Sequence, residues 1–342
     1  MSGRILVARL DNLGDVLLAG PAVRAVQASG AAVTILCGPK GRAAAELLPG
    51  VEDIVEFRAP WIDPDGHAVN DAEIDALLAD MRARGFQQAA VLTSFHQSPL
   101  PLALLLRLAG VPTIAAISVD YPGTLLDVRH LVDDDLHEVE RNLSLVATLG
   151  HRLPPGDDAC LSVELPDDDL PAEVQRPFVV VHPGASVPAR AWSVDGHRRA
   201  VAALVAGGWN VVVTGGPGER ALTAVVADEP GVVDLGGRTK FAELARVLAA
   251  AEAVVVGNTG AAHLAVAVGT PVVSVYAPTV PASRWRPWRS PHVLLGDQAI
   301  ACAGCRARLC PVPGHPCVAG VTSDDVLSAV ERLTTRPVGV PA

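Results

Sequence analysis

The amino-acid sequence predicts an α/β protein made of two doubly wound, Rossmann-like domains. Short apolar runs alternate with segments of helical periodicity from Arg4 to Tyr276, which is typical of parallel sheets. A stretch rich in Pro, Asp and Gly, residues 151–177, separates two such series. With 342 residues the chain also exceeds one typical core. We expect domains over residues 1–168 and 169–342 that face a cleft, with the last helix able to pack back on the first domain.

The first half alternates strands and helices in chain order. Its helix over 16–29, for example, follows from Val16, Ala19, Val23 and Val26, which fall on one side at a spacing of three to four. The predicted strands are 4–8, 33–37, 53–57, 89–93 and 113–117, and the predicted helices are 16–29, 41–48, 71–84, 99–108 and 137–149.

The second half repeats this order from Phe178 onward. The predicted strands are 178–181, 209–214, 232–235, 253–256 and 272–276, and the predicted helices are 219–227, 241–251 and 261–268. The repetition supports two domains of the same class.

Three strands of the second half end in polar loops that contain glycine, at 182–186, 214–219 and 257–260. Parallel strands place these ends on one edge, where glycines let the backbone approach a ligand and helix N-termini favour phosphate. They predict a nucleotide site that includes Ser186, Gly215 and Glu219. Neither a Gly-x-Gly-x-x-Gly after the first strand nor a P-loop occurs, which disfavours NAD binding and ATP hydrolysis.

The loop after 253–256 is central to this prediction. Asn258, Thr259 and Gly260 lie between a buried strand and an Ala-rich helix, and His263 follows one turn later. The alternative is a simple strand–helix turn with a surface histidine.

Two first-half residues are candidates for contact with a second substrate. Asp15 begins a helix, where it can cap backbone N–H groups or act as a general base, and the two roles are compatible because a cap favours the ionised carboxylate. His96 follows the strand 89–93 and is a candidate acceptor contact, with a satisfied surface histidine as the alternative.

The net charge of −10 is unevenly distributed along the chain. Residues 1–168 hold 12 basic and 24 acidic residues, whereas residues 169–342 hold 15 and 13. This balance argues against nucleic acid as a partner. It suits an anionic ligand on the second half and a neutral or cationic one on the first.

The N-terminus carries Arg4, Arg9 and Asp11 and lacks the apolar core of a signal peptide. No apolar run approaches 18 residues, so an integral membrane segment is not expected. We expect a cytoplasmic monomer.

Four cysteines are concentrated near the C-terminus. Cys302, Cys305, Cys310 and Cys317, with His315 among them, have a spacing that suggests a structural zinc site. Packed reduced thiols are the alternative, and a disulfide is disfavoured in the cytosol.

Several motifs together resemble glycosyltransferase family 9, the ADP-heptose:lipopolysaccharide heptosyltransferases. The resemblance runs from residue 5 to about residue 317. It rests on Ile5–Leu18 with Pro21–Ala25, His137–Asn142, His182–Ser186 with Arg190 and Trp192, Gly257–His263, and Gly269–Val273.

This resemblance implies a GT-B fold and an inverting transfer from a nucleotide sugar that needs no metal. It implies Asp15 as the base, with Asn12 and Gly14 of the same motif on the acceptor side, where the strand end also places His96. On the donor side it implies that Arg190, usually Lys in the family, neutralises the diphosphate. It also implies that Thr259, Gly260 and His263 contact the diphosphate and ribose and that Glu219 lies near the ribose. Asn258 stands where the family often has Asp.

The expected reaction is transfer of a sugar, such as heptose from ADP-heptose, to an acceptor hydroxyl. The uneven charge favours a small amino-sugar or aminocyclitol acceptor, and a lipopolysaccharide core is the alternative. Two other classes remain open. They are a nucleotide-sugar epimerase or hydrolase, and a non-catalytic nucleotide-sugar-binding protein.

Overall fold

The computed structural model describes residues 3–62, 66–94, 97–167 and 169–334. The chain divides into two compact units, residues 1–164 and 165–342. The division falls four residues before the boundary that the sequence predicts, within the same stretch rich in Pro and Asp.

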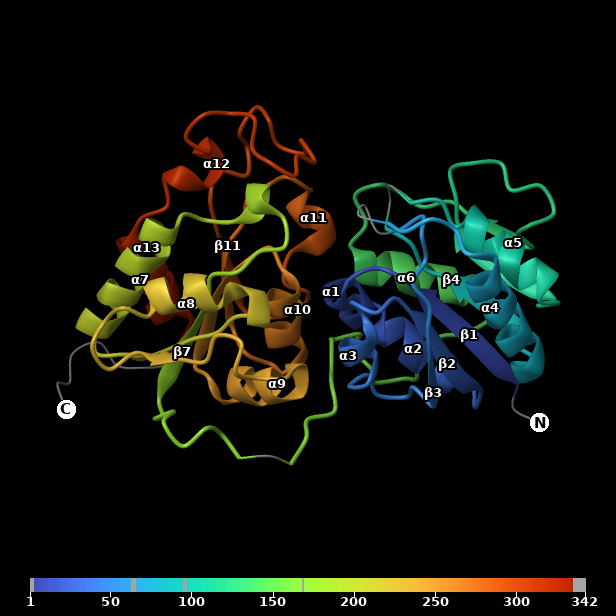
Figure 1. Cartoon of the computed structure of the whole chain (residues 1–342), viewed down its shortest axis with the longest axis horizontal. Coiled ribbons are helices and arrows are strands. Elements are labelled where there is room, and N and C mark those ends of the chain that lie inside the picture. Colours follow the sequence, from blue (N-terminus) through green and yellow to red (C-terminus); the bar gives the residue numbers. More distant parts are fainter. Residues whose placement is uncertain (1–2, 63–65, 95–96, 168, 335–342) are drawn as a thin grey trace. The chain divides into compact units, whose positions relative to one another are not determined.

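The first unit is a six-stranded parallel sheet in the order β3-β2-β1-β4-β5-β6. Its strands are β1 Arg4–Arg9, β2 Ala32–Cys37, β3 Asp53–Glu56, β4 Gln88–Val91, β5 Thr113–Ile117 and β6 Val128–His130. Its helices are α1 Leu13–Leu18, α2 Gly20–Gln27, α3 Arg42–Ala45, α4 Asp71–Arg84, α5 Leu100–Leu108 and α6 Glu138–Thr148. One helical layer contains α1, α2, α3 and α6, and the other contains α4 and α5 (Figure 1).

The second unit is also a six-stranded parallel sheet, in the order β12-β11-β10-β7-β8-β9. Its strands are β7 Phe178–His182, β8 Asn210–Val213, β9 Val233–Asp234, β10 Ala253–Gly257, β11 Val272–Val275 and β12 His292–Leu295. Its helices are η1 Pro188–Arg190, α7 Val194–Ala206, η2 Pro217–Glu219, α8 Arg220–Val226, α9 Phe241–Ala250, α10 Gly260–Ala267, α11 Ala282–Trp285, α12 Pro316–Ala319 and α13 Ser323–Leu333.

The predicted fold class is confirmed, since both units are doubly wound parallel α/β sheets. The cleft between them stays a prediction. The last described helix, α13, packs against α7 and the strands β10, β11 and β12. It belongs to the second unit, and the expected packing of the last helix on the first domain stays a prediction.

One predicted helix is wrong in detail. The segment predicted as a single helix over 16–29 is two helices, α1 and α2, which meet at Ala19. Pro21 is the cause, because proline has no N–H to donate to the carbonyl of Leu17. The break keeps α1 short. Because α1 begins at Leu13, Asp15 lies in its first turn.

The inner strands of both sheets are buried on both faces, whereas the edge strands β3, β6, β9 and β12 are only partly buried. Every residue of β7 is buried, and Ala253 to Val256 of β10 have no exposed surface. Parallel strands covered by helices on both faces read as continuous apolar runs, which is why the sequence predicts them well. Polar side chains are therefore displaced to the loops at the strand ends.

Candidate functional site

The candidate donor site lies at the switch point of the second sheet, where β7 and β10 are neighbours but their following helices cover opposite faces. Loops at the carboxyl ends of strands flank such a point, and ligands of open α/β sheets bind there. The loop after β7 carries Ser186 and Arg190, and the loop after β10 carries Asn258 and Thr259.

Buried polar atoms without partners gather at the start of α10. Within the described ranges, Asn258 Nδ2, Thr259 Oγ1 and His263 Nδ1 have no hydrogen-bond partner. Asn258 and His263 are only 5% and 4% exposed. A buried polar group without a partner is costly, so a ligand that supplies oxygen atoms fits this place.

Arg190 contributes positive charge to the same group of residues. Its Nε donates to Thr279 Oγ1 at 3.3 Å. Burial, and to a smaller extent the positive charge of Arg190, lower the pKa of His263 to about 4. His263 is therefore neutral near pH 7, while the arginine stays charged.

Glu219 closes the neighbouring loop after β8. Its Oε2 accepts from Gly216 N at 2.7 Å. A Cβ atom at Gly184 would overlap the Glu219 carboxylate, so the glycine lets this carboxylate lie against the loop after β7. Gly215 lies beside the same carboxylate. A Cβ atom added at Gly215 would lie 3.2 Å from Glu219 Oε2.

Burial also lowers the pKa of His182, and the Glu219 carboxylate opposes this effect. His182 Nδ1 lies 3.0 Å from Thr214 Oγ1. Both side chains are buried, so their contact joins the end of β7 to the end of β8, where the two loops begin.

The structure thus brings together Arg190, Asn258, Thr259, Gly260 and His263 in one region, and Gly215 with Glu219 in the adjacent one. Ser186 is exposed in the loop between β7 and η1. Sequence reasoning missed Thr279. It follows the end of β11, and this position at the same sheet edge is the signal that could have identified it.

The first unit has its own polar cluster at the carboxyl edge, centred on Arg9 at the end of β1. Arg9 Nη2 lies 3.0 Å from both Asp11 Oδ2 and Asp15 Oδ1, and Nη1 lies 3.3 Å from Glu138 Oε2. Among these carboxyl side chains, Asp15 is 18% exposed, whereas Asp11 and Glu138 are 3% and 0% exposed. A substrate can therefore reach Asp15 most easily.

Asn12 precedes α1 and is exposed, and its side chain makes no cap bond to the helix. Gly14 is buried in the first turn. His96 lies outside the described residues. Asp15 does not cap α1, since the N-cap position is Asn12. The Asp15 carboxylate instead accepts a hydrogen bond from Arg9.

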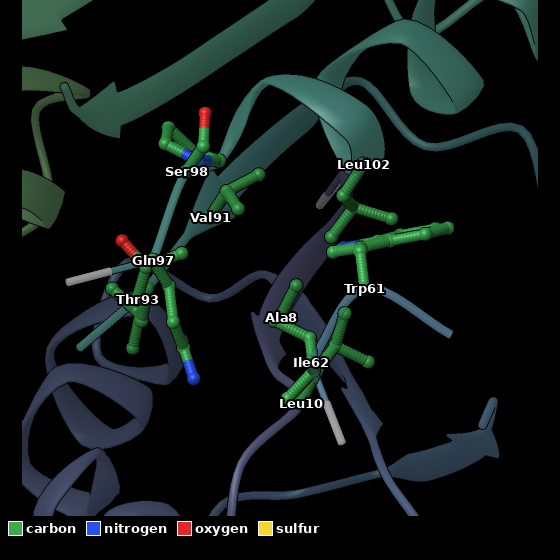
Figure 2. Close-up of a pocket in the computed structure, with 11 residues that line it drawn as sticks. Ala8, Leu10, Trp61, Ile62, Val91, Thr93, Gln97, Ser98 and Leu102 are labelled. Atoms are coloured by element: carbon green, nitrogen blue, oxygen red, sulfur yellow. The ribbon is translucent and has the colours of Figure 1, made fainter. Parts of the chain in front are cut away.

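A small pocket of about 240 Å³ lies beside this edge (Figure 2). Trp61 and Ile62 from the loop after β3 face Ala8 and Leu10 across it, and Thr93, Gln97 and Ser98 supply polar atoms. Gln97 Oε1 also accepts from Ser94 N at 3.2 Å, which connects the pocket to the Arg9 cluster.

The four cysteines near the C-terminus line one cavity of about 330 Å³ together with His315. Within the described part of the chain, no group of three or more His, Cys, Asp or Glu side chains is placed to hold a metal ion. The loop is tied to η1, since Ala189 N donates to Arg308 O at 3.0 Å and His315 Nε2 lies 3.1 Å from Ala189 O.

The pattern of glycosyltransferase family 9 (heptosyltransferase) matches residues 81–315. The chain belongs to this family. It is 30% identical to lipopolysaccharide heptosyltransferase 1 of Salmonella typhimurium over 305 residues, 81% of this chain and 89% of the relative. It is also 30% identical to lipopolysaccharide heptosyltransferase 3 of Escherichia coli K12, over 44% of this chain and about half, 47%, of that relative.

A solved structure has the same fold. Escherichia coli heptosyltransferase WaaC with ADP-2-deoxy-2-fluoro heptose superposes with a TM-score of 0.72 at 20% identity, covering 96% of this chain and 99% of that one. The family prediction made from the motifs is confirmed. Among the described residues of this family member, no helix is long and apolar enough to span a bilayer.

Gly184→Ala should destabilise the second unit by about 1 kcal/mol, because the new methyl group must displace the Glu219 carboxylate that accepts from Gly216 N. Gly218→Ala is the matched control, since nothing lies within 4 Å of its Cβ position. Thermal unfolding monitored by circular dichroism measures both. Equal unfolding midpoints for the two variants would show that the loops do not depend on the close approach.

Proposed function

We propose that this family 9 protein is an inverting glycosyltransferase that moves a sugar from a nucleotide diphosphate donor to an acceptor hydroxyl. The donor binds the second unit, and the first unit supplies the base. The observation that carries this proposal is the set of unpartnered buried atoms of Asn258, Thr259 and His263 at the start of α10, next to the charged Arg190.

The proposed donor is ADP-heptose or a close relative. The support is that a relative of the same fold was solved with an ADP-heptose analogue. Here the Arg190 guanidinium and the N–H groups at the start of α10 would stabilise the negative charge that develops on the departing diphosphate. Neutral His263 can donate to or accept from the diphosphate or ribose.

The reaction would be one displacement. Asp15 takes the proton of the acceptor hydroxyl, the oxygen forms a bond to the anomeric carbon, and the bond from that carbon to the diphosphate breaks. One displacement inverts the configuration at this carbon. Arg190 and the α10 N-terminus supply the charge stabilisation, so we propose that no metal ion is required.

The proposed acceptor is a small neutral or amine-bearing molecule such as an amino-sugar or aminocyclitol. Its support is the acidic balance of residues 1–168 and the carboxylates at the edge of the first sheet. A lipopolysaccharide core is the second candidate, which the names of the relatives favour. We propose that the protein acts as a cytoplasmic monomer.

Asp15→Asn and Arg190→Ala should impair different steps, turnover and donor binding respectively. Asp15→Asn removes the base and should lower kcat by roughly 10²–10⁴-fold while leaving the affinity for ADP unchanged. Arg190→Ala removes a charge-assisted contact and should weaken ADP binding by roughly 10- to 100-fold. Turnover assays with EDTA present and calorimetric titration with ADP measure the two effects, and each variant is the control for the other. Undiminished turnover by Asp15→Asn would exclude Asp15 as the base. Binding of ADP by the wild type without any turnover would instead indicate a non-catalytic binding protein.

The acceptor class can be tested by competition. Purified protein with ADP-heptose should glycosylate a soluble amino-sugar or aminocyclitol faster than a phosphorylated lipid core, because the acidic first unit repels anionic acceptors. Mass spectrometry of the products measures both rates. A faster reaction with the lipid core would assign the lipopolysaccharide acceptor instead. Donor consumption without any acceptor would indicate an epimerase or a hydrolase.

We also propose that Cys302, Cys305, Cys310 and Cys317 hold a structural zinc ion, for which their common cavity is the support. Binding would require the loop to close around the ion, since the described side chains do not converge on one. Elemental analysis of protein purified without added metal should give about one zinc per chain, and Cys305→Ser should lose it. Cys160→Ser, at a cysteine far along the chain from the loop, should keep it. Four titratable thiols and no zinc would indicate reduced, packed cysteines.

A further inference from the structure

The Arg9 cluster contains more charged groups than one catalytic base needs. Arg9 is completely buried, and its guanidinium contacts three carboxyl groups. Ser94 Oγ lies 2.9 Å from both Arg9 Nη2 and Asp11 Oδ2, and so connects them. These residues come from β1, the loop after it, α1, the loop after β4 and the start of α6.

The charges of this cluster do not balance when all its groups are ionised. Arg9 and Arg141 supply two positive charges, since Arg141 Nε lies 3.4 Å from Glu138 Oε1. Asp11, Asp15 and Glu138 supply three negative charges. An excess negative charge in a buried place is costly, so the cluster favours one additional proton.

The geometry indicates where that proton resides. Asp11 Oδ2 is engaged by Arg9 and Ser94, whereas Asp11 Oδ1 has no hydrogen-bond partner among the residues that the structure describes and no contact with solvent. A proton on Oδ1 leaves Oδ2 free to accept from both Arg9 and Ser94, and it balances the charges of the cluster. Consistent with this, burial raises the pKa of Asp11 and the Asp15 carboxylate raises it further, while Arg9, Gln97 and Ser94 act in the opposite direction.

We propose that Arg9 is a positioning residue that fixes the Asp15 carboxylate for proton abstraction, and that Asp11 stays protonated behind it. With Asp11 neutral, the Arg9 charge is shared by Asp15 and Glu138 alone. Arg9 contacts Oδ1 of Asp15, which leaves its other oxygen for the acceptor hydroxyl. This proposal rests on the proposed function, in which Asp15 is the base.

The pH dependence of kcat tests the state of Asp11. Asparagine resembles a protonated carboxyl group, so Asp11→Asn should leave the acidic limb of the kcat profile at the pH of the wild type. If Asp11 were ionised, Asp11→Asn would remove a negative charge beside the proposed base and move the limb to lower pH by about one unit. A shift of that kind would overturn the proposal.

The positioning role of Arg9 has its own readout. Arg9→Lys keeps the charge but cannot hold three carboxyl groups with one ammonium. It should lower kcat at least about tenfold while KM for the acceptor and ADP affinity stay within about twofold. Unchanged kcat, or a loss shared equally by kcat and ADP affinity, would contradict the role. Ser94→Ala, a milder change, should lower kcat in the same selective way if Arg9→Lys fails to fold.

Asp127→Asn is the matched control, because Asp127 pairs with Arg107 in the same unit but outside the cluster. Its kcat and acidic limb should equal those of the wild type. Asp15→Asn separates the two proposals. Retained turnover in that variant removes the proposed function, whereas lost turnover combined with a shifted limb in Asp11→Asn removes only the proposal on Asp11.

Discussion

Burial of parallel strands on both faces is the constraint on which the rest of this structure depends. In β10 the side chains from Ala253 to Val256 have no solvent contact, and the first polar side chain after them is that of Asn258. Helices cover both faces, so functional groups can lie only at the strand ends. Both units obey this rule, since the Arg9 cluster and the α10 N-terminus each lie at a carboxyl edge next to a switch point.

The same constraint decides what the sequence reveals. Continuous apolar runs such as 4–8 and 253–256 predict buried strands. The polar residues that follow them predict Asp15 after the first run, and Asn258 and Thr259 after the second, as site residues. Strand β6, with three residues, and strand β12, with four, were not predicted. Both lie at an edge of their sheet and are only partly buried, so neither has the fully buried apolar run that marks an inner strand.

Contacts between distant segments are the part that local patterns cannot give. Arg9 and Glu138 are 129 positions apart, and Arg190 and Thr279 are 89 apart. In the sequence Arg9 resembles any basic residue at the end of a strand, and only the fold shows that it is fully buried among carboxylates. The motif around Glu138 is part of the family resemblance. That Glu138 pairs with Arg9 depends on how the fold brings β1 and the start of α6 together.

The two edges treat charge in different ways. At the first edge a buried arginine is surrounded by carboxylates, so its charge is compensated within the protein. At the second edge burial keeps His263 neutral, and the lasting positive charge belongs to Arg190, which is partly exposed.

This difference matters for the proposed reaction. A group that must neutralise a departing diphosphate works best if its charge does not vary with pH, and a guanidinium meets this condition whereas an exposed imidazole would not. If His263 were protonated near pH 6, its positive charge would hold the diphosphate product more tightly and slow its release. Burial beside Arg190 prevents this protonation. Because His263 is buried, the two roles are divided between two residues. Arg190 supplies the positive charge, and the neutral His263 supplies hydrogen bonds.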